Sequence, residues 1–333
     1  MFDLVPCLLI INNTTRAMPD ARVVRSPHLA SASAAEVSAQ FNVGVVQMAM
    51  TDSPENNADN AERLVREAVA QGANVVILPE LFEHRYFPKA QLDANLELAR
   101  DVDDCALLQR FAKLSEELSI VLPVSFYEKA GQARFNSCAV YENGTRLGVY
   151  RKSHIPDGPG YQEKFHFSPG DTGGIVFATR FGALGVGICW DQWFPEYARV
   201  LCLLGADLLV YPTAIGSEPP PAAPLDSRGH WRRVMQGHAG ANLTPVVAAN
   251  RVGAEPIPGG ADGDVLTFYG SSFIADVDGA LLADMNDTEE GVRVVRVDRV
   301  ANDRRRSAWG VFRDRRPDVY GAIGTMDGTS RSK

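Results

Sequence analysis

Apolar and β-branched residues gather into short runs from residue 41 onwards, and amphipathic segments separate these runs. The stretch FNVGVVQMAM, which begins at Phe41, is apolar enough to predict a buried strand. Ser53-Pro54 predicts the start of a helix, and Gly72 predicts its end. One face of this helix is apolar: Ala61, Leu64, Val65, Ala68 and Val69. The next apolar run, ANVVILPE, is short and bounded, so it predicts a second buried strand that ends at Glu80.

The same alternation continues along the rest of the chain. Helices are predicted at residues 106–118, 195–205 and 228–243. Strands are predicted for SIVLPVSFYE, GGIVFATR, ALGVGIC, ADLLVYPTA and TPVVAAN, and two more in residues 271–276 and 291–297. Residues 134–141 and 146–150 flank Glu142-Asn143-Gly144, and this spacing predicts a hairpin because Asn-Gly favours tight turns.

Strand–helix units and hairpins thus follow one another without a linker-like break between residues 41 and 319. Strands this apolar are covered on both faces, so we predict an α/β fold in which two mixed sheets stack with helices outside. We assign residues 41–328 to one domain, residues 1–40 to an irregular N-terminal extension and residues 329–333 to a tail. A transit peptide is the alternative for residues 14–40, where Ala, Ser and Arg are common and acids are sparse.

Composition narrows the class of protein. The 333 residues are 45% hydrophobic and 22% charged, as is ordinary for a globular chain with a sizeable core. The net charge of −8 argues against a nucleic-acid partner, because such proteins usually carry a basic patch. The arginine-dense stretch at residues 303–316 also holds acids, which favours a solvated or inter-subunit face. No apolar stretch approaches the roughly 18 to 20 residues that a membrane-spanning helix needs, so no membrane partner is predicted.

The cysteines indicate the redox environment. The chain has five of them: Cys7, Cys105, Cys138, Cys189 and Cys202. Their odd number, wide spacing and lack of a CxxC pair argue against a disulfide framework and against a structural zinc site. The first residues include a short apolar run but no basic region before it and no clear cleavage site. We therefore expect a cytoplasmic protein.

Three reactive side chains stand at the C-terminal ends of predicted strands. They are Glu80 after VVILP, Lys152 after GVYR and Cys189 after GVGI. Open α/β sheets place their sites beyond strand ends, which makes each position a candidate. Taken singly, each has an ordinary interpretation: a helix-terminal charge for Glu80, a solvated cation for Lys152 and a small buried hydrophobe for Cys189.

Together the three residues match the needs of amide hydrolysis. The reaction requires a nucleophile, a base that moves its proton to the leaving amine, and a cation near the developing oxyanion. A cysteine thiolate is a strong nucleophile, and a nearby lysine favours its ionisation and can donate to the oxyanion. A buried glutamate is a competent base, and the backbone N–H of Trp190 is a second candidate oxyanion donor. Whether His154 and His166 line the site is left open by their spacing.

The stretches VVILPELFE, YRKSHIPDGPGYQEKFHFSPGDTG and GVGICWDQWFPEYAR resemble the three signature regions of the nitrilase superfamily of carbon–nitrogen hydrolases, in the same order. The resemblance covers residues 41–328. It implies a four-layer αββα sandwich, no cofactor and no metal, with self-association into a homo-oligomer through a face around the nucleophile helix. It also implies that Glu80 is the general base, Lys152 the oxyanion-stabilising cation and Cys189 the nucleophile. A second glutamate, Glu163 of YQEKF, would hold the lysine or assist the base.

Further motifs, KSHIPDGPGYQEKF, CWDQWFPE, YPTAIGSEP and LDSRGHWRRVMQGHAGAN among them, resemble a branch that acts on a cationic ureido compound. A substrate with an ammonium group needs a carboxylate in the far pocket. The best candidate is Glu218, with Asp191 and Asp226 as weaker ones. Tyr86 and Trp190 are expected to pack on the methylene stem or to cover the cation. The alternatives are hydrolysis of a carbamoyl β-amino acid, a simple amide or a nitrile, or an inactive oligomeric scaffold.

Overall fold

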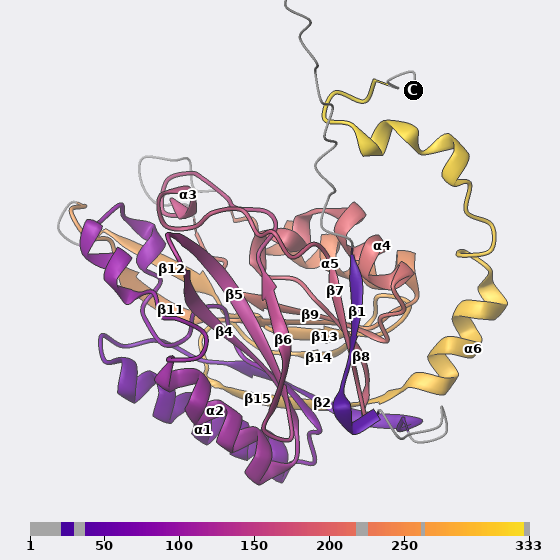
Figure 1. The fold of residues 1–333 in the computed structure, drawn as a ribbon, viewed down its shortest axis with the longest axis horizontal. Coiled ribbons are helices and arrows are strands. Elements are labelled where there is room, and N and C mark those ends of the chain that lie inside the picture. The colour runs from indigo at the N-terminus through magenta and orange to yellow at the C-terminus, as the bar shows by residue number, and fades with distance from the viewer. Residues whose placement is uncertain (1–20, 30–36, 218–225, 261–263, 330–333) are drawn as a thin grey trace, which may run out of the picture.

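The computed structural model describes residues 21–29, 37–217, 226–260 and 264–329. Its body consists of two stacked sheets with helices on the outside (Figure 1). One sheet has the strand order β15-β2-β3-β4-β5-β6, and the other has the order β1-β7-β8-β9-β10-β13-β14. Both sheets contain parallel and antiparallel pairs. The predicted αββα sandwich with two mixed sheets is confirmed.

The first sheet comprises β2 (Gln40–Gln47), β3 (Val75–Ile77), β4 (Val121–Ala130), β5 (Ala133–Glu142), β6 (Thr145–Arg151) and β15 (Gly291–Asp298). The second comprises β1 (Arg22–Arg25), β7 (Ile175–Thr179), β8 (Gly182–Val186), β9 (Leu208–Thr213), β10 (Val246–Asn250), β13 (Phe273–Ala275) and β14 (Leu281–Asp284). A separate hairpin joins β11 (Val252–Pro256) to β12 (Val265–Tyr269).

Alternating side chains of the strands build two cores. On β2 and β3, Val45 and Ile77 face the second sheet, whereas Val46 and Val76 face the helices. The outer core lies under α1 (Pro54–Ala70) and α2 (Ala106–Leu118), and α4 (Pro195–Leu203) and α5 (Arg228–Asn242) cover the second sheet (Figure 1). Burial on both faces explains why the central strands, such as β3 and β9, are nearly continuous apolar runs.

The N-terminal stretch differs from the sequence prediction. We predicted an irregular extension up to residue 40, but β1 pairs in parallel with β7, and Arg22 N–H donates to Gly174 O at 2.9 Å. The irregular assignment is therefore wrong for β1. The strand RVVR is short and largely exposed, so its pairing depends on backbone hydrogen bonds and leaves little hydrophobic pattern.

The remaining elements are short or peripheral. α3 (Glu163–His166) is a single turn that follows β6, and α6 (Arg299–Trp309) with the residues after it extends along the outside of the body (Figure 1). α6 has no buried residue. In the described part of the chain, no helix combines the length and apolar character that crossing a membrane requires.

Candidate active site

The ends of β3 and β6 bring two carboxylates and one lysine into contact. Glu80 follows β3, Lys152 follows β6, and Glu163 begins α3. The Lys152 Nζ lies 2.9 Å from Glu80 Oε1 and 2.7 Å from Glu163 Oε2, and all three side chains are fully buried. The structure thus places these three predicted residues in one ion-pair cluster.

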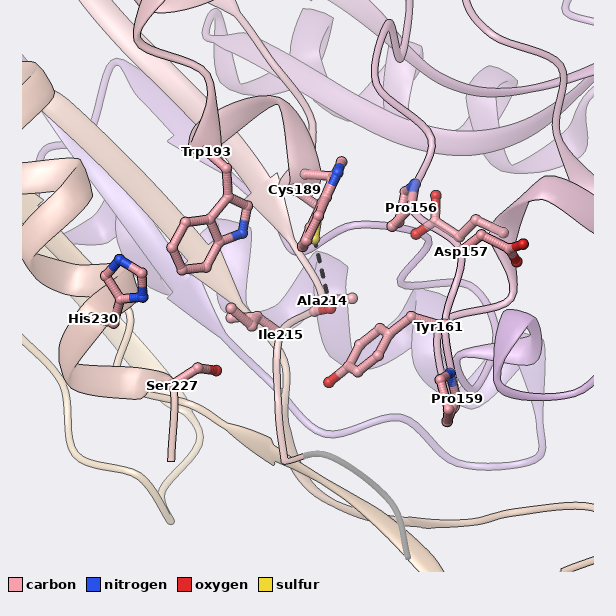
Figure 2. A pocket seen from close by; sticks show the side chains of 13 residues that line it. Pro156, Asp157, Pro159, Tyr161, Cys189, Trp193, Ala214, Ile215, Ser227 and His230 are labelled. Carbon is pink, nitrogen blue, oxygen red and sulfur yellow. Dashed lines mark hydrogen bonds between the residues drawn. The ribbon is translucent and has the colours of Figure 1, made fainter. Parts of the chain in front are cut away.

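Cys189 stands at the end of β8, where the chain turns into the 3₁₀ helix η4 (Cys189–Trp193). Its φ of 42° is a left-handed conformation that non-glycine residues rarely adopt, and such backbone strain is typical of functional turns. The side chain is buried, and the Sγ lies 3.6 Å from Ala214 O (Figure 2).

Burial and charge set the protonation of this cluster. Burial, and then the charge of Glu80, raise the pKa of Cys189 well above its ordinary value, so the resting residue is a thiol. Burial disfavours the Lys152 ammonium, but Glu163 and Glu80 together raise the pKa of Lys152, which keeps it charged. Burial raises the pKa of Glu163 to about 7 against the opposing effect of Lys152, with a further rise from Glu80.

Two residues that sequence reasoning missed hold Glu80 in place. Asn136 on β5 donates from Nδ2 to Glu80 Oε1 at 2.6 Å. Arg251, fully buried, donates from Nη2 to Glu80 O at 2.7 Å and to Leu81 O at 3.0 Å. Leu81 has a φ of 49°, so Arg251 caps carbonyls of a left-handed turn. For Asn136 the available signal was a polar residue inside a mostly buried strand, because buried polar groups need partners.

A cavity of about 380 Å³ opens beside Cys189 (Figure 2). Trp193, Ser227 and His230 lie on one side of Cys189 in this view, and Pro156, Asp157 and Tyr161 lie on the other. The described residues of its wall are Pro156, Asp157, Gly158, Pro159, Tyr161, Glu163, Cys189, Trp190, Trp193, Ala214, Ile215, Ser227 and His230. These described residues are mostly apolar; they include the carboxylates of Asp157 and Glu163 but neither Lys nor Arg.

Comparison with known proteins places this geometry in a family. The family model described as carbon–nitrogen hydrolase matches residues 42–305. The chain belongs to the carbon–nitrogen hydrolase family.

Relatives of this carbon–nitrogen hydrolase span nearly its whole domain. It is 54% identical to an N-carbamoylputrescine amidase of Arabidopsis thaliana, across 86% of this chain and 96% of the relative. It is 45% identical to a citrullinase of Francisella tularensis, across 86% of this chain and 98% of the relative. A carbon–nitrogen hydrolase from Helicobacter pylori G27 superposes with a TM-score of 0.80 at 35% identity, covering 86% of this chain and 99% of the other. The predicted membership of the nitrilase-like carbon–nitrogen hydrolases is confirmed.

The residues that we predicted to bind the substrate of this hydrolase do not all lie in the described cavity wall. Trp190 lines the cavity and is 39% exposed. Tyr86 is buried, is absent from the described wall and donates from its hydroxyl to Glu163 Oε1 at 2.6 Å. Tyr86 therefore contacts the ion-pair cluster, which differs from the stem contact that we expected. Glu218 lies outside the described residues.

Asp191 also differs from the expectation of a substrate residue. Its Oδ2 accepts the Ile188 N–H at 2.9 Å and the Tyr150 hydroxyl at 2.7 Å, and its Oδ1 lies 2.7 Å from His154 Nδ1. The carboxylate is fully buried and stabilises the turn that carries Cys189. His154 and His166 are both absent from the described cavity wall. Asp226 forms a salt bridge with Arg228 and is likewise absent from the described wall.

Proposed function

We propose that this carbon–nitrogen hydrolase is an N-carbamoylputrescine amidohydrolase. It converts N-carbamoylputrescine and water to putrescine, ammonia and carbon dioxide, and so contributes to polyamine synthesis from agmatine. Identities of 51% to 54% with plant N-carbamoylputrescine amidases support this substrate. The structural observation that carries the proposal is the cavity wall, which combines carboxylates and tryptophans without a described cation.

The charge of the wall discriminates between ureido substrates. An N-carbamoyl amino acid or citrulline carries a carboxylate, which Arg or Lys usually binds. Neither residue type occurs in the described wall, and residues 218–225 contain none in their sequence. A terminal ammonium instead suits carboxylates and the faces of Trp190 and Trp193. Glu218 remains our main candidate for the carboxylate that binds it.

The chemical steps follow from the arrangement around Cys189. Glu80 takes the Cys189 proton, and the thiolate attacks the carbamoyl carbon. Glu80 Oε2 suits this role because it is buried without a hydrogen-bond partner among the described residues. Lys152 and the Trp190 N–H stabilise the oxyanion, and Glu163 keeps Lys152 in position.

Collapse of the tetrahedral intermediate breaks the bond to the terminal nitrogen, which receives the proton from Glu80 and leaves as ammonia. The S-carbamoyl enzyme then reacts with a water molecule that Glu80 deprotonates. The C–S bond breaks, the thiol regains its proton, and the released N-alkyl carbamate loses carbon dioxide to give putrescine. The chemistry needs no redox partner.

Ammonia release from four compounds tests the proposal. We expect kcat/KM to be highest for N-carbamoylputrescine, with lower values for N-carbamoyl-β-alanine, L-citrulline and agmatine. A higher value for any of the other three would contradict the proposed substrate. In parallel, iodoacetamide should label Cys189 faster than the other thiols; equal slow labelling of all five would favour an inactive scaffold.

Glu218 is tested by a separate substitution. Glu218→Gln should raise KM for N-carbamoylputrescine far more than for an uncharged ureido analogue, because only the former presents an ammonium. Asp157→Asn is measured in parallel, since Asp157 is the exposed carboxylate in the described wall and the alternative partner of the ammonium. Equal changes of KM for both substrates would remove Glu218 from the amine pocket.

We further propose self-association into a homo-oligomer. Leu203 on α4 is 47% exposed and Trp309 at the end of α6 is 71% exposed, and large apolar side chains of this kind favour contact with a second copy. Sedimentation of the wild type and of Trp309→Asp tests this interface, and a monomeric wild type would refute it. A reducing, cytoplasmic location is also proposed, in keeping with the free thiols of Cys105, Cys138, Cys189 and Cys202.

A further inference from the structure

Asn136 connects the two residues to which we assign acid–base and oxyanion roles. It lies on β5, and its side chain is fully buried. Its Nδ2 donates to Glu80 Oε1 at 2.6 Å, and its backbone carbonyl accepts the Lys152 N–H at 2.8 Å. One residue thus fixes the Glu80 carboxylate with its side chain and the Lys152 backbone with its main chain.

The two oxygens of Glu80 have unequal surroundings. Oε1 accepts hydrogen bonds from Asn136 Nδ2 and from Lys152 Nζ at 2.9 Å. Oε2 is equally buried and has no partner among the described residues. An oxygen that already accepts two N–H donors binds a proton less readily than an oxygen with none. The proton that Glu80 accepts therefore belongs on Oε2.

Among the described residues, the Asn136 side-chain amide bonds to this carboxylate alone. Its Oδ1 is buried and has no partner among the described residues, so the contact with Glu80 determines which way the amide faces. A reversed amide would put Oδ1 against Glu80 Oε1, which is an acceptor facing an acceptor. Because Asn136 is absent from the described cavity wall, its effect on chemistry passes through Glu80.

We propose that Asn136 is a positioning residue that occupies Glu80 Oε1 and thereby reserves Oε2 as the proton acceptor for Cys189. The inference rests on the proposed roles of Glu80 and Cys189 but not on the identity of the substrate. Removing the Asn136 donor makes Oε1 a second basic oxygen and makes protonation of the carboxylate easier. The enzyme then loses its active base at a higher pH.

The test compares Asn136→Ala with Asn242→Ala. Asn242 is a matched control, since it is also buried, donates from Nδ2 once, to His238 O at 2.9 Å, and has an Oδ1 without a partner among the described residues. It lies at the opposite end of α5 from the cavity residue Ser227. Each alanine variant thus removes the same group from a comparable environment.

The readout is the pH dependence of Cys189 alkylation by iodoacetamide, followed by mass spectrometry between pH 4 and 9. Glu163→Gln is introduced into every protein compared, the wild type included, because Glu163 contacts the same lysine and its pKa of about 7 would add a second titration in this range. The acid limb of this profile is the range in which the rate falls as the pH falls. In Asn136→Ala we expect this limb to lie about one pH unit higher, so that at a fixed pH on the limb the reaction is about tenfold slower. Asn136→Asp, which has nearly the same shape, should move it further, because two adjacent carboxylates share a proton. Asn242→Ala should reproduce the wild-type profile.

Several results would overturn the inference. If Asn136→Ala lowers the alkylation rate by the same factor at every pH and leaves the acid limb in place, Asn136 has only a packing role. Should that variant fail to fold, an unmoved limb in Asn136→Asp would have the same meaning. Because alkylation needs no substrate, failure to hydrolyse N-carbamoylputrescine would leave this test intact.

Discussion

Replacing Glu163 by glutamine should change how the stability of the fold depends on pH. The pKa of Glu163 is raised from 4.5 to about 7, first by burial and then, against the pull of Lys152, by Glu80. Two ionised carboxylates and one ammonium would leave a net negative charge in a fully buried cluster. Burying an uncompensated charge is costly, so the cluster favours retention of one proton.

The size and sign of the effect follow from this rise. Below pH 4.5 the carboxyl of Glu163 is protonated in both the folded and the unfolded chain, so its contribution is constant. Between pH 4.5 and about 7, only the unfolded chain loses the proton, and the folded state therefore becomes less stable as pH rises. The shift corresponds to a loss of about 3 kcal/mol across this window. Glu163→Gln cannot titrate and lacks this loss.

Urea unfolding of the wild type and of Glu163→Gln, followed by tryptophan fluorescence and circular dichroism from pH 4.5 to 8, measures the difference. Other titrating groups are common to both proteins and cancel in the comparison. Glu142→Gln, in which a buried carboxylate paired with Arg180 is replaced, should keep the wild-type trend. The reasoning about the buried cluster is refuted if the free energies of unfolding of the wild type and Glu163→Gln differ by the same amount at every pH. It is also refuted if the wild type becomes more stable relative to the variant as pH rises.

Three further substitutions test individual contacts. Cys189→Ser should lose several orders of magnitude in kcat with an unchanged circular dichroism spectrum, because a hydroxyl does not ionise as a thiol does; near-normal turnover would contradict the nucleophile role. Tyr86→Phe removes the hydroxyl that donates to Glu163 Oε1 at 2.6 Å. The free energy of unfolding, measured in urea, should fall by about 1.5 to 3 kcal/mol, and unchanged stability would contradict this contact. Asp191→Ala leaves the Ile188 N–H unpaired and removes one acceptor of the Tyr150 hydroxyl, so the free energy of unfolding should fall by about 1 to 3 kcal/mol. Iodoacetamide labelling of Cys189 should also slow, whereas labelling at the wild-type rate would argue against a role of Asp191 in the turn.

The fold was predictable because its central strands are buried on both faces. The runs that become β2, β3, β4 and β9 are continuous apolar stretches, and such stretches indicate strands without knowledge of their partners. The exposed strand β1 has no such pattern, and its backbone pairing with β7 depends on where β7 lies. Its existence was therefore beyond reach of local sequence reasoning.

The ion-pair cluster was partly predictable for a similar reason. Glu80 and Lys152 stand where strands end, and strand ends gather at one edge of a sheet. Asn136 offers no such marker, since it lies inside β5 and reaches Glu80 only because β5 pairs with β4 in a particular register. Tyr86 likewise reaches Glu163 across 77 positions of sequence, which local patterning does not encode.

Trp190 and Asp191 show how adjacency in sequence can mislead about a site. Both directly follow Cys189, and both were expected to contact the substrate. In a 3₁₀ helix successive side chains point about 120° apart, so three consecutive residues of η4 cannot all face the same cavity. Trp190 is 39% exposed and lines the cavity, whereas the Asp191 side chain is fully buried among Ile188, Tyr150 and His154. The turn thus separates two tasks: one neighbour of Cys189 forms the wall that a substrate meets, and the other stabilises the left-handed backbone that presents the thiol.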